Sequence, residues 1–396
     1  MKLIEKDLSK FEGKNILIRL DLNVPISNKI IQDASRIDKI LDTLKFLLNK
    51  NLNLILISHI GRPKGKKIDD LSLKPVADYL ENKLNVKVNL IKNDIFSISK
   101  EELFKNKKKE IIMLENIRYY GDEEKNDKNF AKKLASLGDI YVNEAFSCSH
   151  RPHASVNEIT NYIPSFAGIL LNKEVIALNK ITKEILRPVT CIIGGAKIST
   201  KIPVIKNLIS KFDNIIIVGG MANNIVKFKG YKIGKSIHEE GYEKIIDEIF
   251  LLAEKNNCKI IYPEDFLTGK SLNDNSEHKM IDQIEQDEMI LDIGASSIEK
   301  IKKLINNSKT ILWNGPAGYF ENPNFSFGSY EIAKTIAEQT SNKKLYSVLG
   351  GGDTISLINK FNLFNEYNFV STAGGAFLEY LEGKELPGIK ALNYYV

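Results

Sequence analysis

Short apolar runs alternate with longer amphipathic stretches along almost the whole 396-residue chain. The short runs are rich in Ile, Leu and Val, which is typical of strands buried in a parallel sheet. The longer stretches repeat their apolar positions with helical spacing. In the first half of the chain we expect strands at 15–20, 52–58, 86–90, 111–114 and 140–142, with helices at 36–49, 73–84 and 130–137.

A long amphipathic stretch at 166–181 carries Lys and Glu on its polar side and is stopped by Arg187-Pro188. We interpret it as a helix that connects two domains. The strand pattern then restarts, with a helix expected at 355–360 and strands expected at 189–193, 214–218, 259–262, 289–291, 310–313, 345–349 and 369–372. This alternation predicts an α/β fold of two Rossmann-like domains, each a parallel sheet covered by helices on both faces.

The size of the chain agrees with two domains, because 396 residues are many for a single core. We place an N-terminal domain at 1–165, an interdomain helix at 166–182 and a C-terminal domain at 183–379. The tail at 380–396 is expected to pack back on the N-terminal domain.

Glycine runs follow several of the predicted strands in the second half, and 350–352 is the longest of them. Glycine lets backbone N–H groups approach a ligand closely, and a helix that starts behind it adds free N–H groups that suit phosphate. Asp353 is itself an anion, so it fits such a site if Mg²⁺ lies between it and the phosphates. Thr354 is placed as an N-cap or as a phosphate donor. A tight structural turn with a capping Asp is the alternative. Glycine runs after strands recur along the chain, however, and this favours the phosphate site.

Basic residues follow the predicted strands of the first half. Lysine supplies most of the positive charge, and only six arginines occur, five of them within the first 151 residues. Arginine offers a planar, two-pronged donor to carboxylate or phosphate, although any one of them can also be a plain surface charge. Ligands of parallel sheets bind at the carboxyl ends of the strands. These ends carry Arg19, Arg36, His59, Arg62, Arg118, His150, Arg151 and His153.

The basic edge fits a small, highly charged anion, and the glycine-rich edge fits a magnesium nucleotide. Two such sites on two domains imply that the domains close to bring the substrates together. The net charge of +6 allows an anionic ligand without demanding nucleic acid. The three scattered cysteines form neither a disulfide framework nor a metal motif. Because no signal peptide and no membrane-spanning apolar run is found, we expect a cytoplasmic protein without membrane contact.

The chain resembles the phosphoglycerate kinase family, and the resemblance runs nearly from end to end. Seven motifs fall in the order of the family, at 19–25, 58–63, 114–118, 194–202, 313–316, 350–354 and 381–388. The resemblance implies a phosphotransferase with a carboxyl group as acceptor. Its reaction is reversible phosphoryl transfer between 1,3-bisphosphoglycerate and MgADP, which gives 3-phosphoglycerate and MgATP. A monomer is the expectation that comes with the family.

The resemblance also assigns roles to residues. Phosphoglycerate is held by Asp21, Asn23, Arg36, His59, Arg62, Arg118 and Arg151. The nucleotide is bound by Lys201, Gly219, Gly220, Asn314, Glu321, Gly350, Gly351, Gly352, Asp353 and Thr354. Gly219 and Gly220 lie against adenine, Glu321 binds the ribose, and Asp353 holds Mg²⁺. The catalytic groups that stabilise the moving phosphoryl are Arg36, Lys197, Gly352 and Gly375, with Gly374 opening the same helix as Gly375.

Some positions depart from the family pattern. Ser147-Cys148-Ser149 replaces a Gly-Thr-Ala stretch, Pro152 and Ala373 replace a common Ala and Gly, and 295–297 replaces a Gly-Pro-x-Thr pattern. None of these changes removes a charged group that is expected to do chemistry. For Cys148 we favour a structural role.

Other residues leave alternatives open. We favour substrate contact for His59 over a purely structural role. His150 and His153 either orient Arg151 or are structural. Trp313 is expected to serve packing, and the lysines at 107–109 are expected to form a solvated face.

Two other classes of protein are less consistent with the sequence. A nicotinamide dehydrogenase would place Gly-x-Gly-x-x-Gly after its first strand, with an acid about 20 residues later. Here the first strand is followed by Asp21-Leu22-Asn23, and the glycine runs come late. A nucleic-acid-binding module would cluster basic residues with aromatic ones. The arginines of this chain instead occur singly, mostly at strand ends, which suits a small ligand.

Overall fold

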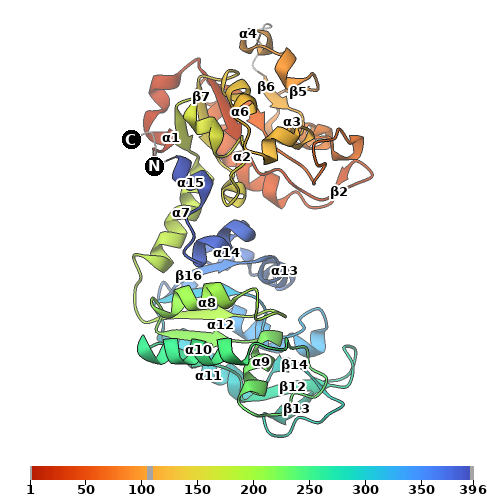
Figure 1. The fold of residues 1–396 in the computed structure, drawn as a ribbon, viewed down its shortest axis with the longest axis vertical. Coiled ribbons are helices and arrows are strands. Elements are labelled where there is room, and N and C mark those ends of the chain that lie inside the picture. Colours follow the sequence, from red (N-terminus) through yellow and green to blue (C-terminus); the bar gives the residue numbers. More distant parts are fainter. Residues whose placement is uncertain (1, 105–109, 393–396) are drawn as a thin grey trace. The chain divides into compact units, whose positions relative to one another are not determined.

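The structure is a computed structural model that describes residues 2–104 and 110–392 (Figure 1). The predicted solvated lysines at 107–109 lie outside the described residues. The chain divides into two compact units, one formed by 1–175 with 385–396 and the other by 176–384. Helix α7 (Ile169–Thr182) begins in the first unit and ends in the second. Among the described residues, no helix combines the length and the apolar composition that a bilayer crossing needs.

The first unit is built on a six-stranded sheet in which every neighbouring pair is parallel. Across the sheet its strands are β5 (Val88–Ile91), β6 (Ile111–Leu114), β4 (Asn53–Ile57), β1 (Asn15–Arg19), β7 (Ile140–Asn143) and β8 (Ser165–Ala167). A two-stranded hairpin, β2 (Ile26–Ser27) with β3 (Ile30–Ile31), follows β1. The α-helices are α1 (Ile4–Asp7), α2 (Ser35–Leu48), α3 (Lys74–Leu84), α4 (Lys100–Leu103), α5 (Gly121–Glu124), α6 (Lys128–Ala135) and α15 (Pro387–Ala391).

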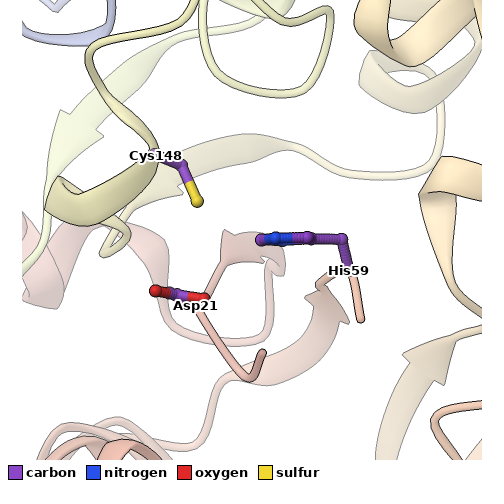
Figure 2. Close-up of side chains that lie close together, drawn as sticks. All are labelled: Asp21, His59 and Cys148. Carbon is purple, nitrogen blue, oxygen red and sulfur yellow. The ribbon is translucent and has the colours of Figure 1, made fainter. Parts of the chain in front are cut away.

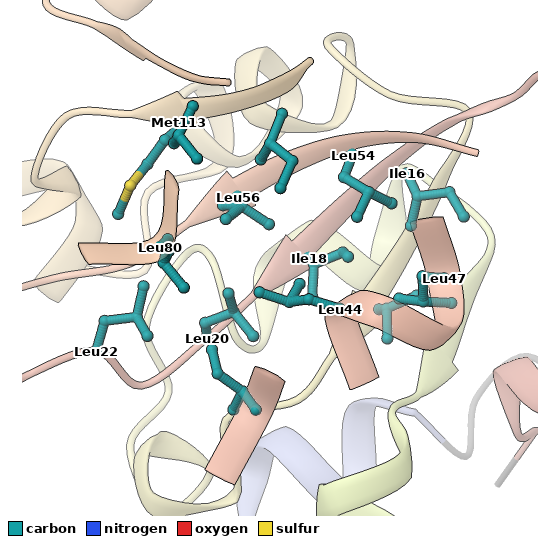
Figure 3. Packing of buried hydrophobic residues seen from close by; sticks show 14 of the residues in the cluster. Ile16, Ile18, Leu20, Leu22, Leu44, Leu47, Leu54, Leu56, Leu80 and Met113 are labelled. Atoms are coloured by element: carbon teal, nitrogen blue, oxygen red, sulfur yellow. The ribbon is translucent and has the colours of Figure 1, made fainter. Parts of the chain in front are cut away.

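One face of this sheet is covered by α2 and α3. The buried residues of α2 recur every three or four positions, so they form one apolar stripe along the helix. Leu44 and Leu47 of this stripe pack in one cluster with Ile16, Ile18 and Leu56 of the central strands (Figure 3). Burial of these side chains is the main force that holds α2, and therefore Arg36 near its start, against the sheet.

The second unit repeats the design with another six-stranded parallel sheet. Its strands are β11 (Lys259–Ile261), β10 (Asn214–Ile217), β9 (Val189–Ile193), β15 (Thr310–Asn314), β16 (Tyr346–Gly350) and β17 (Phe369–Ser371). Helices α11 and α12 pack on each other, whereas α8 packs on α10 and α14. The helices are α8 (Ile202–Ile209), α9 (Gly220–Phe228), α10 (Glu243–Lys255), α11 (Ala295–Asn307), α12 (Phe327–Ser341), α13 (Gly352–Lys360) and α14 (Gly375–Leu381).

The sequence prediction is wrong about the strand at 289–291. It lies not in the parallel sheet but in a separate antiparallel sheet, as β14 (Met289–Ile293) beside β12 (Asp265–Gly269), which also pairs with β13 (Glu277–Met280). The sequence analysis missed β12 and β13. Three of the four residues of β13 are exposed, so this strand lacks the apolar run by which a buried strand is recognised.

The start of the connecting helix also needs correction, because Phe166 and Ala167 belong to β8 and pair with β7. The helix begins at Ile169. The buried carboxylate of Glu144 fixes this start, since it accepts the backbone N–H groups of Leu170 and Leu171 at 2.9 and 3.1 Å. A carboxylate is favoured there because the first N–H groups of a helix lack partners within the helix.

The strand order creates a switch point in each sheet. From β1 the chain moves outward through β4, and it later returns to β7 on the other side of β1. In the second sheet the corresponding neighbours are β9 and β15. Loops that leave the carboxyl ends at such a point diverge and leave room for a ligand.

Candidate active site

The candidate phosphoglycerate site lies at the carboxyl edge of the first sheet. Segments that leave β1, β4, β6 and β7 carry most of the residues singled out in the sequence, and α2 adds Arg36. Arg36 donates from NH1 to Oδ2 of Asp21 at 2.8 Å and to the carbonyl of Asn23 at 3.3 Å. The hydroxyl of Ser147 donates to the same Asp21 oxygen. Asp21 therefore links the segment after β1 to α2 and to the turn after β7.

Asn23 and Arg118 both bind the backbone of Gly61 in the loop after β4. The N–H of Gly61 donates to Oδ1 of Asn23 at 2.9 Å, and NH1 of Arg118 donates to the carbonyl of Gly61 at 3.0 Å. Arg118 is buried, and its Nε lies 3.6 Å from Glu124. These bonds hold the loop that presents Arg62, whose side chain is exposed.

The histidines after β7 differ in their contacts. Nε of Arg151 donates to Nε2 of His150 at 3.1 Å, so His150 orients this arginine. His153 is buried, and its Nδ1 lies 3.9 Å from Oε1 of Glu123. Burial first, and then the charges of Arg118, Arg19 and Arg151, lower the pKa of His153 to about 3. His153 is therefore neutral at physiological pH.

Arg19 has a different role from the one expected of a basic strand end. Its side chain is fully buried and turns inward from the last residue of β1. Nε donates to the hydroxyl of Ser155 at 2.9 Å, NH1 to the carbonyl of Leu20, and NH2 lies 3.0 Å from Nδ1 of His59. Arg19 thus holds other residues of the site in place and does not itself face a ligand.

Asp21, His59 and Cys148 direct their side chains toward one another (Figure 2), with one potential ligand atom of each within 4.8 Å of the others. Such a set of donors is of the kind that binds zinc. However, NH2 of Arg19 also lies 3.7 Å from the Cys148 sulfur, and Arg36 pairs with Asp21. Two fixed cations beside the ligand atoms oppose a third, so this cluster is better suited to an anion.

The candidate nucleotide site lies at the carboxyl edge of the second sheet, where the loops after β9 and β15 pack backbone against backbone. A Cβ on Gly194 would lie 2.1 Å from the carbonyl oxygen of Pro316, and one on Gly315 would lie 2.2 Å from that of Gly194. Gly315 also has a φ of +103°. Only glycine permits this close approach and this backbone conformation.

Asn314, the last residue of β15, connects the lysine and the glycine run that the sequence singled out. Its Oδ1 accepts a hydrogen bond from Nζ of Lys201, and its Nδ2 donates to the carbonyl of Gly350 at 2.5 Å. Burial outweighs the nearby charge of Asp353 and lowers the pKa of Lys201. Asn314 therefore fixes the position of Lys201 relative to the loop that begins at Gly350.

Thr354 does not act as the N-cap that the sequence suggested. Helix α13 begins at Gly352 with Gly351 as its N-cap, so the helix starts three residues earlier than predicted. Thr354 is fully buried, and its hydroxyl accepts the N–H of Gly315 at 2.7 Å. Its contact holds the loop after β15 against the start of α13.

Three helices of this unit start in the same way, directly after a strand and behind a glycine with positive φ. The glycines are Gly219 before α9, Gly351 before α13 and Gly374 before α14. Gly352 and Gly375, the first helical residues, are exposed, as is Lys197. The free N–H groups of these helix starts provide donors for phosphate at one edge of the sheet.

A cavity of about 430 Å³ adjoins the starts of α9 and α13. Its lining includes Gly219 and Gly220, which the resemblance assigns to adenine, Glu321, which it assigns to the ribose, and Asp353, which it assigns to Mg²⁺. Most of the remaining wall is apolar, with Ile237, Phe266, Leu272, Met289, Leu291 and Phe320. An apolar pocket with a few polar groups at its edge suits a flat, aromatic base.

Several residues that build the first of these sites were not predicted from the sequence. The hydroxyl of Ser58 accepts the N–H of Leu22 and donates to the carbonyl of Leu20. The buried side chain of Asn116 donates to the carbonyls of Ile60 and Leu71. Both residues lie within the motifs at 58–63 and 114–118, so their place in a motif was the only available signal. Nothing in the sequence pointed to Glu123 and Ser155.

The comparison with known proteins agrees with this geometry. The sequence profile of the phosphoglycerate kinase family matches residues 6–384. Phosphoglycerate kinases of Methylorubrum extorquens and Dictyoglomus turgidum are 42% and 44% identical to this chain, over 98% and 99% of its length and 97% and 98% of theirs. The solved phosphoglycerate kinase of Coxiella burnetii matches with a TM-score of 0.90 and 37% identity over 97% of both chains. The chain therefore belongs to the phosphoglycerate kinase family.

Proposed function

We propose that the first unit binds the phosphoglycerate and the second binds the nucleotide in the reaction of this family. The chain is a phosphotransferase of glycolysis that acts on phosphoglycerate. The assignment of one substrate to each unit rests on the contrast between the two sheet edges. The first presents Arg36, Arg62, Arg118 and Arg151, whereas the second presents glycine-started helices beside an apolar cavity.

The reaction needs alignment and positive charge more than proton transfer. In the direction of ATP synthesis, an oxygen of the ADP β-phosphate bonds to the phosphorus of the acyl phosphate, and the bond from that phosphorus to the carboxyl oxygen breaks. The attacking oxygen is already an anion, and the leaving group departs as a carboxylate. Charge on the transferred phosphoryl oxygens is stabilised by cations and N–H donors. We assign this role to Arg36, Lys197 and the amides of Gly352 and Gly375.

Magnesium fits one position in the second unit. The carboxylate of Asp353 is exposed in the first turn of α13 and lines the cavity beside the phosphate donors. Mg²⁺ is usually held by one or two carboxylates together with substrate phosphates. Bound there, it would neutralise phosphate charge, while Lys201 and the helix starts orient the nucleotide.

A coupled assay with 3-phosphoglycerate and MgATP tests the division between the units. Arg62→Ala should raise the KM for 3-phosphoglycerate and leave the KM for MgATP within twofold. Asp353→Asn should raise the KM for MgATP and shift the magnesium dependence to higher concentration. The division of substrates is rejected if both variants change both KM values equally.

Two further parts of the proposal concern the state of the protein. We expect a monomer that acts in the cytoplasm, and light scattering of the purified enzyme should give the 44.7 kDa of one chain. A gel shift with DNA or RNA should show no complex at assay concentrations, because the basic groups are arranged for a small ligand. A mass of two chains would reject the monomer.

A further inference from the structure

The contact between Arg19 and His59 determines which nitrogen of the imidazole ring carries the hydrogen. NH2 of Arg19 lies 3.0 Å from Nδ1 of His59, and both side chains are buried. A guanidinium has five N–H groups and no acceptor, so it can only donate. Nδ1 of His59 must therefore offer its lone pair, and a neutral imidazole then carries its single hydrogen on Nε2.

We propose that Arg19 is a positioning residue that holds His59 as the neutral Nε2–H tautomer, so that the ring offers a hydrogen-bond donor to the anionic substrate. This inference rests on the proposed binding of phosphoglycerate to the first unit, in which the family resemblance assigns a contact to His59. Figure 2 shows the imidazole directed toward Asp21 and Cys148, and the side chain of His59 is buried. A ring with the other tautomer would present a bare lone pair to an anion.

The positive charge of Arg19 is balanced by the carboxylate of Glu123, to which Ser155 connects it by hydrogen bonds. Nε of Arg19 donates to Oγ of Ser155 at 2.9 Å, and that hydroxyl donates to Oε1 of Glu123 at 2.6 Å. The N–H of Ser155 donates to the other carboxylate oxygen at 2.9 Å. Glu123 is fully buried. This chain from Glu123 through Ser155 fixes the guanidinium, and because Arg19 also contacts Leu20 it has little freedom to leave His59.

The surroundings of His59 also oppose its protonation. Arg19, Arg36, Arg118 and His153 face it from β1, α2 and the segments after β6 and β7, and Asp21 and Cys148 complete the cluster. Burial is the main cause that lowers the pKa of His59 well below its usual range, followed by the charges of Arg19 and Arg118. A protonated ring would also turn an Nδ1–H toward an N–H of Arg19. The ring of His59 then stays neutral across physiological pH, and its Nε2–H remains a hydrogen-bond donor.

The tautomer can be observed directly in the active enzyme. Protein labelled with ¹⁵N-histidine is recorded by long-range ¹H–¹⁵N correlation between pH 5.5 and 8, and His59→Gln assigns the His59 signals among the five histidines. We expect an unprotonated Nδ1, a protonated Nε2 and no titration in this range. An Nδ1–H tautomer, or a ring that titrates near pH 6.5, would overturn the proposal without any further variant.

Two variants then test the cause. Glu123→Gln keeps an oxygen that accepts the hydroxyl of Ser155, and Arg19 keeps its own bonds to Ser155 and Leu20, so the His59 spectrum should stay unchanged. Arg19→Met with Glu123→Gln removes both buried charges together, so neither is left alone in the core. In this double variant His59 should titrate, and at pH 8 the KM for 3-phosphoglycerate should be about tenfold above that of Glu123→Gln, the effect of one strong hydrogen bond.

The pH dependence separates positioning from a general loss of structure. At each pH, the KM for 3-phosphoglycerate of the double variant is divided by that of Glu123→Gln. The titration of the substrate phosphate affects both values equally and therefore cancels in this ratio. This ratio should rise from pH 5.5 to 8, because the released His59 loses its positive charge, while the KM for MgATP stays within twofold. A constant ratio, or an unchanged spectrum of the double variant, contradicts the role of Arg19. If His59→Gln leaves the KM for 3-phosphoglycerate unchanged, the proposed function of His59 is rejected, whereas the tautomer is judged by the spectrum alone.

Discussion

NH1 of Arg36 lies 2.8 Å from Oδ2 of Asp21, and the hydroxyl of Ser147 donates to the same oxygen. The hydroxyl of Ser147 is therefore a second donor to the carboxylate that holds Arg36. The side chain of Arg36 is still more than one-third exposed. Arg36 is thus held in place by Asp21 and keeps an exposed surface, as our proposal of a contact with the transferred phosphoryl group requires.

Arg36→Ala should lower kcat by about 10²–10³, because it removes a charged donor that is needed most in the transition state. The KM for MgATP should change less than twofold, since the nucleotide binds at the other unit in our proposal. Steady-state kinetics with both substrates measures this. Arg187→Ala is a matched control, because Arg187 pairs with Asp213 at an exposed position before the start of β9, at the opposite end of that strand from the loop that carries the glycine motif. A kcat for Arg36→Ala within threefold of the control would exclude the catalytic role.

Asn314→Ala should raise the KM for MgATP about tenfold, because the loss frees Lys201 and leaves the carbonyl of Gly350 without its side-chain donor. The KM for 3-phosphoglycerate should stay the same. Asn256→Ala removes an exposed asparagine from the end of α10 and serves as the control. Equal changes in the two KM values would show that Asn314 acts on stability and not on the nucleotide site.

Gly315→Ala should destabilise the second unit by at least about 1–3 kcal/mol, because φ is +103° and the new Cβ would meet the backbone of Gly194. The loss of unfolding free energy is measured by urea unfolding, which is monitored with a probe that responds to nucleotide binding. Gly121→Ala is the matched control, since its nearest neighbour would lie 3.9 Å from the new Cβ. The close packing of the two loops is refuted if both variants unfold at the same urea concentration.

Asp292 should make stability depend on pH. Burial raises the pKa of this fully buried carboxyl to about 7, against the hydrogen bonds that it accepts from Gly328 and Ile293. In the unfolded chain the pKa is about 3.9. Between these values the folded state binds more protons, so the free energy of unfolding contributed by Asp292 falls as pH rises from about 4 to 7, by at most about 1.4 kcal/mol per pH unit.

Asp292→Asn removes this titration. The free energy of unfolding of the wild type minus that of the variant should therefore fall as pH rises from 4 to 7 and level off above pH 7. Urea unfolding at half-unit pH steps measures the difference, and Asp282→Asn controls for the loss of an exposed carboxylate. Parallel curves for wild type and Asp292→Asn would show that Asp292 does not titrate in this window.

The sequence alone was sufficient for the α/β class, because the apolar runs of β1, β4, β9 and β15 are long enough to identify buried strands. It also led to the family, because four of the seven motifs fall at the ends of those strands. Local patterns carry this information, since a buried strand and a glycine turn each depend mainly on their own residues.

Only the tertiary structure decided what depends on contacts between distant segments. Residue 289 was correctly placed in a strand, but its partners at β12 have little local signal, so its sheet could not be foreseen. Arg19 and Arg36 look alike in sequence. The first is buried against Ser155, 136 residues away, whereas the second stays partly exposed beside Asp21. Burial and pairing decide whether a charge supports a site or acts in it, and both arise only when the chain has folded.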